Sequence, residues 1–141
     1  MERRKALQQL FLGTGTLMVV PAALASCSKS SNAGAPLTGD LTLDLTSSKY
    51  SQLTQSGGSV IVGSTIVVNT GSDNFIALSA ICTHAGCLVE YQSSQKDFYC
   101  PCHGSVFSTS GSVMRGPAAR PLAKYQTTYD ATAKTVTVKG A

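Results

Sequence analysis

Short runs of alternating apolar and polar residues begin at residue 41 and continue almost to the end of the chain. Leu41, Leu43 and Leu45 alternate with threonine and aspartate, which predicts a half-buried β-strand. The β-branched runs 60–62 and 65–68 are separated by a Gly-Ser pair, which predicts a tight hairpin. No segment shows a convincing helical period, so the pattern predicts an all-β fold.

The second half of the chain continues with short apolar runs between turn residues. Residues 50–57 predict a turn-rich connection, with one helical turn as the alternative, and further strands are predicted at 75–81, 88–91, 96–99, 106–107, 122–129 and 135–138. The runs 88–91 and 96–99 predict a hairpin, the last two runs predict an antiparallel pair, and Gly116-Pro117 begins a loop. We expect an antiparallel β-sandwich with a small subdomain inserted near residues 80–118.

The first 26 residues have the pattern of an export signal. Arg3, Arg4 and Lys5 give a positive start, and a modest apolar stretch runs from residue 10 to residue 25. Pro21 interrupts this stretch, which is shorter than the roughly 20 apolar residues of a membrane-spanning helix. The arginine pair resembles a twin-arginine signal, and an ordinary secretion signal is the alternative.

The residues that end this signal, Leu24-Ala25-Ser26-Cys27, resemble a bacterial lipobox. In a lipobox the cysteine is acylated and becomes the mature N-terminus, and two or more acyl chains give stable membrane anchoring. The alternative is an unmodified Cys27 thiol in a retained membrane helix. Residues 27–39 are rich in Ser, Ala, Gly and Asn and predict a flexible tether to a domain spanning 40–141.

The charge and the aromatic content of the chain argue against a nucleic-acid partner. The formal net charge is +4, and without residues 1–26 it is +2, because eight Lys and Arg then face six Asp and Glu. The chain has no basic stripe interleaved with aromatic residues, and it has no Trp. Nucleic-acid binding therefore has almost no support.

Both histidines and four of the five cysteines fall between residues 82 and 105. Two thiolates and two imidazoles suit a tetrahedral zinc ion or a [2Fe-2S] cluster in which two His replace two Cys on one iron. Structural zinc sites usually pair ligands of one kind, whereas each short segment here supplies one Cys and one His. The spacing favours a binuclear cluster with Cys82 and Cys100 on one iron and His84 and His103 on the other. Structural zinc is the alternative.

The segments 82–87 and 100–105 resemble the two cluster loops of Rieske iron–sulfur proteins. The resemblance extends over about residues 60–125, and it is to the branch of cytochrome bc-type and b6f-type complexes and arsenite oxidase. It implies a disulfide between Cys87 and Cys102. Two residues depart from the pattern: Ala85 stands where the bc-type family usually has Leu, and Phe107 stands where high-potential members have Tyr.

The same resemblance implies a defined surrounding for the cluster. We expect glycines that let backbone N–H groups approach the sulfurs, a serine hydroxyl that bonds a bridging sulfide, a ring that lacks the usual second hydroxyl, and a proline-bearing loop over the cluster. These residues are Gly86, Gly104, Ser105, Phe107, Gly116 and Pro117.

The function implied is one-electron transfer by an exported respiratory electron carrier or a subunit of a quinol-oxidising complex. We expect it to be anchored to a bacterial membrane through the N-terminal lipid, facing the periplasm or the outside. The expected partners are a quinol-oxidising cytochrome b-type subunit and a cytochrome c-type acceptor. The alternative is the small subunit of an arsenite-oxidase-like enzyme, with a molybdenum subunit as its partner. The sequence contains no nucleophile–base pair, so we expect an electron-transfer component with no catalytic residues of its own.

Overall fold

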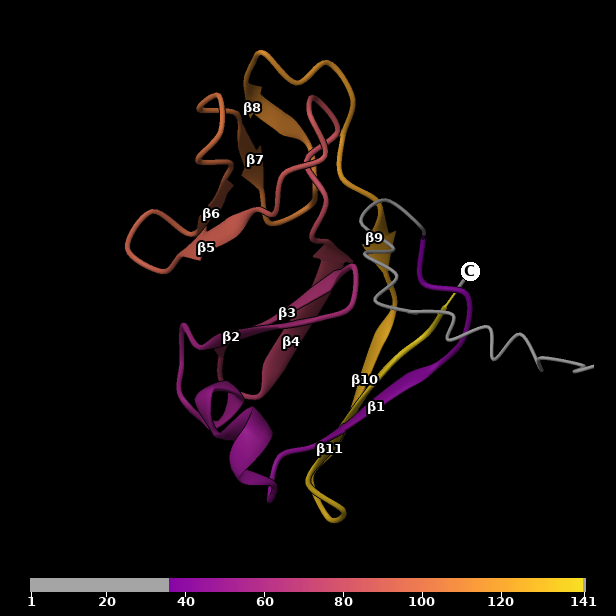
Figure 1. Cartoon of the computed structure of the whole chain (residues 1–141). Coiled ribbons are helices and arrows are strands. Elements are labelled where there is room, and N and C mark those ends of the chain that lie inside the picture. The colour runs from indigo at the N-terminus through magenta and orange to yellow at the C-terminus, as the bar shows by residue number, and fades with distance from the viewer. Residues whose placement is uncertain (1–35, 141) are drawn as a thin grey trace, which may run out of the picture.

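The computed structural model describes residues 36–140. The predicted export signal, the lipobox cysteine Cys27 and most of the predicted tether lie outside these residues. Within residues 36–140 the chain forms three antiparallel sheets and a short 3-10 helix, η1 (Ser48–Thr54), and no helix there has the length and apolar character needed to span a membrane. The predicted all-β, antiparallel fold class is confirmed (Figure 1).

The strands are short, and each sheet combines segments from different parts of the chain. The first sheet has the order β1 (Leu41–Asp44), β11 (Thr135–Val138), β10 (Thr127–Asp130). The second has the order β2 (Ser59–Val62), β3 (Thr65–Gly71), β4 (Asn74–Ser79), β9 (Lys124–Tyr125). The third has the order β5 (Glu90–Gln92), β6 (Asp97–Tyr99), β7 (Val106–Ser108), β8 (Val113–Arg115).

Strands β3 and β4 form a central layer that is covered on both faces. Ile66, Val68 and Leu78 pack with the third sheet and the loops around it. Val67 and Ala77, which alternate with them, pack with the first sheet and η1. Because both faces are buried, Ile66, Val67 and Val68 of β3 are consecutive apolar residues rather than alternating ones. Figure 1 shows β2–β4 between β5–β8 at the top and β1, β10 and β11 at the lower right.

The predicted strand 122–129 is in fact two strands in different sheets. β9 pairs with β4, and β10 pairs with β11, with Gln126 between them. The chain therefore passes from the central layer to the first sheet at this residue, which the local apolar pattern does not reveal. The sequence also did not predict β8, because a three-residue strand with Met114 and Arg115 exposed carries no alternating signal.

Candidate metal centre

Residues 82–87, here loop 1, form a closed turn at the end of the central layer. The Cys82 N–H donates to the Cys87 carbonyl at 2.7 Å, and the Gly86 N–H donates to the Cys82 carbonyl at 3.0 Å. A bridge between Ile81 and Leu88 closes the base of the loop. Gly86 has a φ of +72°, in the left-handed region that glycine adopts without strain.

Residues 100–105, here loop 2, repeat this backbone arrangement. The Cys100 N–H donates to the Ser105 carbonyl at 2.8 Å, and the Gly104 N–H donates to the Cys100 carbonyl at 2.9 Å. Gly104 has a φ of +80°. Each loop therefore presents a cysteine at its first position and a glycine four residues later, although the histidine comes second after the cysteine in loop 1 and third in loop 2.

The first cysteines of the two loops meet below the surface. Cys82 and Cys100 are 2% and 1% exposed, neither forms a disulfide, and both belong to one apolar cluster. Burial, and then the side chain of Cys82, raises the pKa of the Cys100 thiol. Two adjacent buried thiolates are costly unless a cation compensates them, and metal binding supplies that cation while it removes the protons.

The two histidines lie beside each other at the surface. The ring centroids of His84 and His103 are 4.7 Å apart with an interplanar angle of 81°, and both side chains are exposed. Within residues 36–140, no three His, Cys, Asp or Glu side chains gather around one point as a single metal ion requires. The four donors form a buried sulfur pair and an exposed imidazole pair. Such a set could hold two adjacent irons, with two donors on each.

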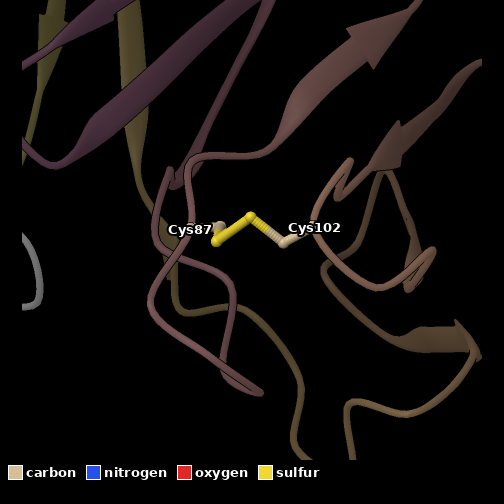
Figure 2. Close-up of a disulfide and its surroundings, with 2 residues drawn as sticks. All are labelled: Cys87 and Cys102. Carbon is tan, nitrogen blue, oxygen red and sulfur yellow. A yellow bond between two sulfur atoms is a disulfide. The ribbon is translucent and has the colours of Figure 1, made fainter.

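The predicted disulfide between Cys87 and Cys102 is confirmed, and it links loop 1 to loop 2. The S–S distance is 2.03 Å and the Cα–Cα distance is 6.4 Å, both ordinary for a disulfide. Figure 2 shows the bond bridging the gap between the two loop ribbons. The disulfide thus connects the same two loops that carry the sulfur pair and the imidazole pair.

Residues 116–121, here loop 3, are fastened to both of the other loops. The Ala118 N–H donates to the Ser105 hydroxyl at 3.0 Å, and the Thr83 hydroxyl donates to the Arg120 carbonyl at 2.6 Å. Loop 3 begins with Gly116-Pro117, a cis peptide, and both of these residues are exposed. The predicted proline-bearing loop is therefore attached to the cysteine- and histidine-bearing loops.

Two predicted neighbours of the sulfur pair are fully buried. Ser105 and Phe107 are both 0% exposed, and Phe107 belongs to the apolar cluster that contains Cys82 and Cys100. The Ser105 hydroxyl accepts from Ala118, so its own proton is available for another acceptor. Phe107 offers no such proton.

Sequence reasoning did not find three residues that hold the loops. Thr83 bonds a carbonyl 37 residues away, and the Arg115 Nε donates to the Gly104 carbonyl at 3.1 Å across 11 residues. Arg120 contributes only its backbone carbonyl to the Thr83 bond. No local pattern marks such contacts, because they depend on where loop 3 returns in space.

Comparison with known proteins gives a consistent result. A family model described as Rieske [2Fe-2S] domain matches residues 43–126. The chain is 43% identical over 65 residues to the cytochrome b6-f complex iron-sulfur subunit of Synechococcus sp. (strain JA-3-3Ab), covering 46% of this chain and 38% of that protein. It is 46% identical over 65 residues to the same subunit of Gloeobacter violaceus, covering 45% of this chain and 34% of that protein. The chain thus spans less than two fifths of these relatives' length.

Two solved structures resemble the fold. The plasma membrane Rieske protein of Synechocystis PCC 6803 superposes with a TM-score of 0.53 at 33% identity, covering 64% of this chain and 94% of that one. The ferredoxin of carbazole 1,9a-dioxygenase from Nocardioides aromaticivorans superposes with a TM-score of 0.54 at 21% identity, covering 76% and 100%. The second likeness is one of fold alone.

Proposed function

Since this chain belongs to the Rieske [2Fe-2S] domain family, we propose that it binds one [2Fe-2S] cluster and passes single electrons between redox partners. The buried sulfur pair beside the exposed imidazole pair is the observation that carries this proposal. The family match covers all four donors and does not favour the zinc alternative. The ligand spacing does not favour zinc either, because structural zinc sites usually pair ligands of one kind.

The proposed ligands are Cys82 and Cys100 for one iron and His84 and His103 for the other. The two loops support this division, since each loop contributes one residue to the cysteine pair and one to the histidine pair. The cluster, when bound, supplies reversible one-electron chemistry. Neutral imidazoles add no negative charge to the site, whereas thiolates do, so this ligand set favours the reduced state more than four cysteines would.

The protein's own residues then divide the remaining tasks. The burial of Cys82 and Cys100 keeps water from the sulfur side of the site. The exposure of His84 and His103 supports the proposal that the imidazoles are the edge through which a partner exchanges electrons. Gly86 and Gly104 allow the tight turns that bring both sides together, and the proposed role of Gly116 and Pro117 in loop 3 is to cover the cluster.

We further propose that the chain works in a respiratory electron-transfer chain. The matched relatives are subunits of cytochrome b6-f complexes, which supports a quinol-oxidising cytochrome b-type donor. A cytochrome c-type protein is the proposed acceptor. The exposed imidazole edge is compatible with either contact.

The proposed location is the bacterial cell envelope, facing the periplasm or the outside. An export signal over residues 1–26, a lipid-modified Cys27, a tether over 27–39 and the domain over 40–141 make up the proposed organisation. The disulfide supports export, because disulfides persist mainly in oxidising compartments. Mass spectrometry of the membrane-extracted protein should find acylated Cys27 as the first residue, and an N-terminus at Met1 would contradict the lipid anchor.

The test of the cofactor is a metal and sulfide analysis of anaerobically purified protein. We expect about two irons and two acid-labile sulfides per chain, as in the Rieske centre. Cys82→Ser and Cys100→Ser should each abolish this content, whereas Cys27→Ser, the matched control, should retain it. One zinc per chain without sulfide would refute the proposal.

A further inference from the structure

Positive charge is placed at the proposed electron-exchange edge although the described part of the chain is nearly neutral. Residues 36–140 contain seven Lys and Arg and six Asp and Glu. The two arginines among them both adjoin the cluster loops. Arg115 donates from Nε to the carbonyl of Gly104, the neighbour of His103, and the backbone carbonyl of Arg120 accepts from Thr83, the neighbour of His84.

Both arginines are exposed, and neither forms an ion pair with a described residue. The ion pair found within residues 36–140 joins Lys139 to Asp40, far from the loops in sequence. The acidic residue nearest to loop 1 in sequence, Glu90, lines a cleft with Lys49 and other residues of η1 and β2. The two guanidinium charges are therefore available to a partner.

Apolar side chains adjoin the same loops. Large hydrophobic residues are exposed at three positions of the described chain, and two of these, Leu88 at 47% and Met114 at 64%, adjoin loop 1 and Arg115 respectively. Met114 stands at a bulge, where Val106 pairs with Arg115 and Phe107 with Val113. A bulge commonly turns a side chain out of the sheet. Exposed apolar residues combined with charge are typical of protein-docking surfaces.

We propose that this end of the molecule docks a redox protein whose own electron-entry edge carries carboxylates. The docking surface consists of His84, His103, Leu88, Met114, Arg115 and Arg120. The inference rests on the proposed function, because it requires the imidazoles to be the exchange edge. Two unpaired charges steer an encounter without binding tightly, which suits a partner that must leave after each electron.

A membrane surface is the less suitable partner for these charges. Lipid-binding basic segments usually contain four to eight Lys or Arg, because each one alone binds an anionic surface only weakly. Two arginines fall short of that number. A protein edge with matched carboxylates needs fewer charges, since specificity comes from their positions.

The experiment measures electron transfer from the reduced full-length protein to two forms of one c-type cytochrome. The first form is native, and the second is succinylated so that its lysines become carboxylates. At low salt, Arg120→Gln should slow reduction of the succinylated form by about two- to fivefold, at the low end of electrostatic steering effects. This change leaves the backbone bond to Thr83 in place. The effect should disappear at high salt, because screening shortens the reach of surface charges.

Two substitutions of Arg115 separate the effect of its charge from the effect of its hydrogen bond to loop 2. Arg115→Lys keeps the charge but loses the Nε bond to Gly104, and Arg115→Gln loses both. We expect the wild-type protein to reduce the succinylated form faster than the native form at low salt, Arg115→Lys to keep this preference and Arg115→Gln to weaken it. Lys134→Gln is the matched control, because it removes one charge from the β10–β11 turn at the bottom of Figure 1, and it should change nothing.

Equal effects of the arginine variants on both cytochromes, or no effect on either, would overturn the proposal. So would an unchanged cytochrome preference together with arginine-dependent binding to phosphatidylserine vesicles, which would identify a lipid surface as the partner. Failure of the proposed function is seen separately, as absence of iron–sulfur absorbance or no electron transfer to either cytochrome at high salt.

Discussion

In the proposed site, single side chains around the sulfur pair are expected to determine how strongly a bound cluster favours an added electron. Phe107 and Ser105 are both fully buried at this position, and they differ in hydrogen-bonding capacity. Ser105 retains a proton to donate after it accepts from Ala118, whereas Phe107 has none. The resemblance to Rieske proteins predicted this difference, and the burial of both residues is compatible with it.

The first prediction is that Phe107→Tyr raises the reduction potential. The new hydroxyl should stabilise the reduced, more negative cluster more than the oxidised one. Hydrogen bonds to charged groups contribute about 1.5–3 kcal/mol, and only the difference between the redox states counts. A difference of about 1 kcal/mol corresponds to roughly 40 mV for one electron, and protein-film voltammetry would measure it.

Phe98→Tyr is the matched control for this substitution. Phe98 lies opposite Phe107 across β6 and β7, is equally buried, and packs against the ring of Tyr91 at 5.1 Å. We expect its added hydroxyl to leave the potential unchanged. If Phe107→Tyr also leaves the potential unchanged while the cluster is retained, Phe107 is an ordinary core residue.

At the scale of elements, three loops rather than any strand form the site. Loops 1 and 2 each close on themselves through backbone hydrogen bonds, and the disulfide links them to each other. Loop 3 is linked to both by side-chain hydrogen bonds. Each link involves different side chains, so each can be removed by a substitution that leaves the four proposed cluster ligands unchanged.

We predict that Thr83→Val loosens loop 3 from loop 1. Valine has nearly the shape of threonine but cannot donate to the Arg120 carbonyl. The loss of such a hydrogen bond costs about 1 kcal/mol, or about 4 °C in the unfolding midpoint of a domain of this size. Calorimetry should show this decrease for Thr83→Val but not for Thr83→Ser. Equal midpoints for the two variants would show that the bond contributes nothing.

Replacing both Cys87 and Cys102 by Ser should weaken retention of the cluster while all four donors remain. The bridge closes a segment with a sequence separation of 15, and a loop of that length corresponds to about 3 kcal/mol in the chain-entropy treatment. The decrease should appear as a lower denaturant midpoint and as faster loss of iron–sulfur absorbance. Cys27→Ser serves as the control, and equal behaviour of the two variants would contradict a structural role for the bridge.

Across the whole molecule, the central layer separates two apolar cores, and the two ends of the described chain meet on the far side of one of them. Lys139 Nζ lies 2.7 Å from Asp40 Oδ2, and the Gly140 N–H donates to the same carboxylate at 3.3 Å. The hydrogen bond from Lys139 holds the pKa of Asp40 below its ordinary value, and the bond from Gly140 contributes in the same direction. Both ends of the described part of the chain are thus connected to the first sheet.

This lowered pKa predicts an acid-dependent contribution to stability. Because the folded pKa of Asp40 lies below the ordinary value of 3.8, the contribution is complete above that pH and is lost as the pH falls through the folded pKa. Asp40→Asn should therefore lower the unfolding midpoint slightly at neutral pH, and the difference from wild type should vanish in acid. Asp73→Asn, in an exposed turn, is the control. A difference that persists unchanged at pH 2 would exclude the ion pair as its cause.

The sequence predicted which residues come together in the loops better than it predicted the sheet arrangement, for physical reasons. The cysteines and histidines are rare residues at fixed spacing, so their pairing is encoded locally. The disulfide followed from the resemblance, and the hairpin 60–62 with 65–68 followed from its turn. By contrast, the change of sheet at Gln126 and the bonds of Thr83 and Arg115 depend on distant partners, which no local pattern encodes.

The double coverage of the central layer has a consequence for the exchange of amide hydrogens with solvent. β3 is paired along both edges, with β2 and β4, and apolar side chains cover both of its faces. Its amides should therefore exchange only when the whole domain opens, whereas those of the edge strands β1 and β8 should exchange through local fluctuations. Since β4, the neighbour of β3, leads directly into loop 1, the slowest-exchanging part of the molecule supports the residues proposed to contact a partner.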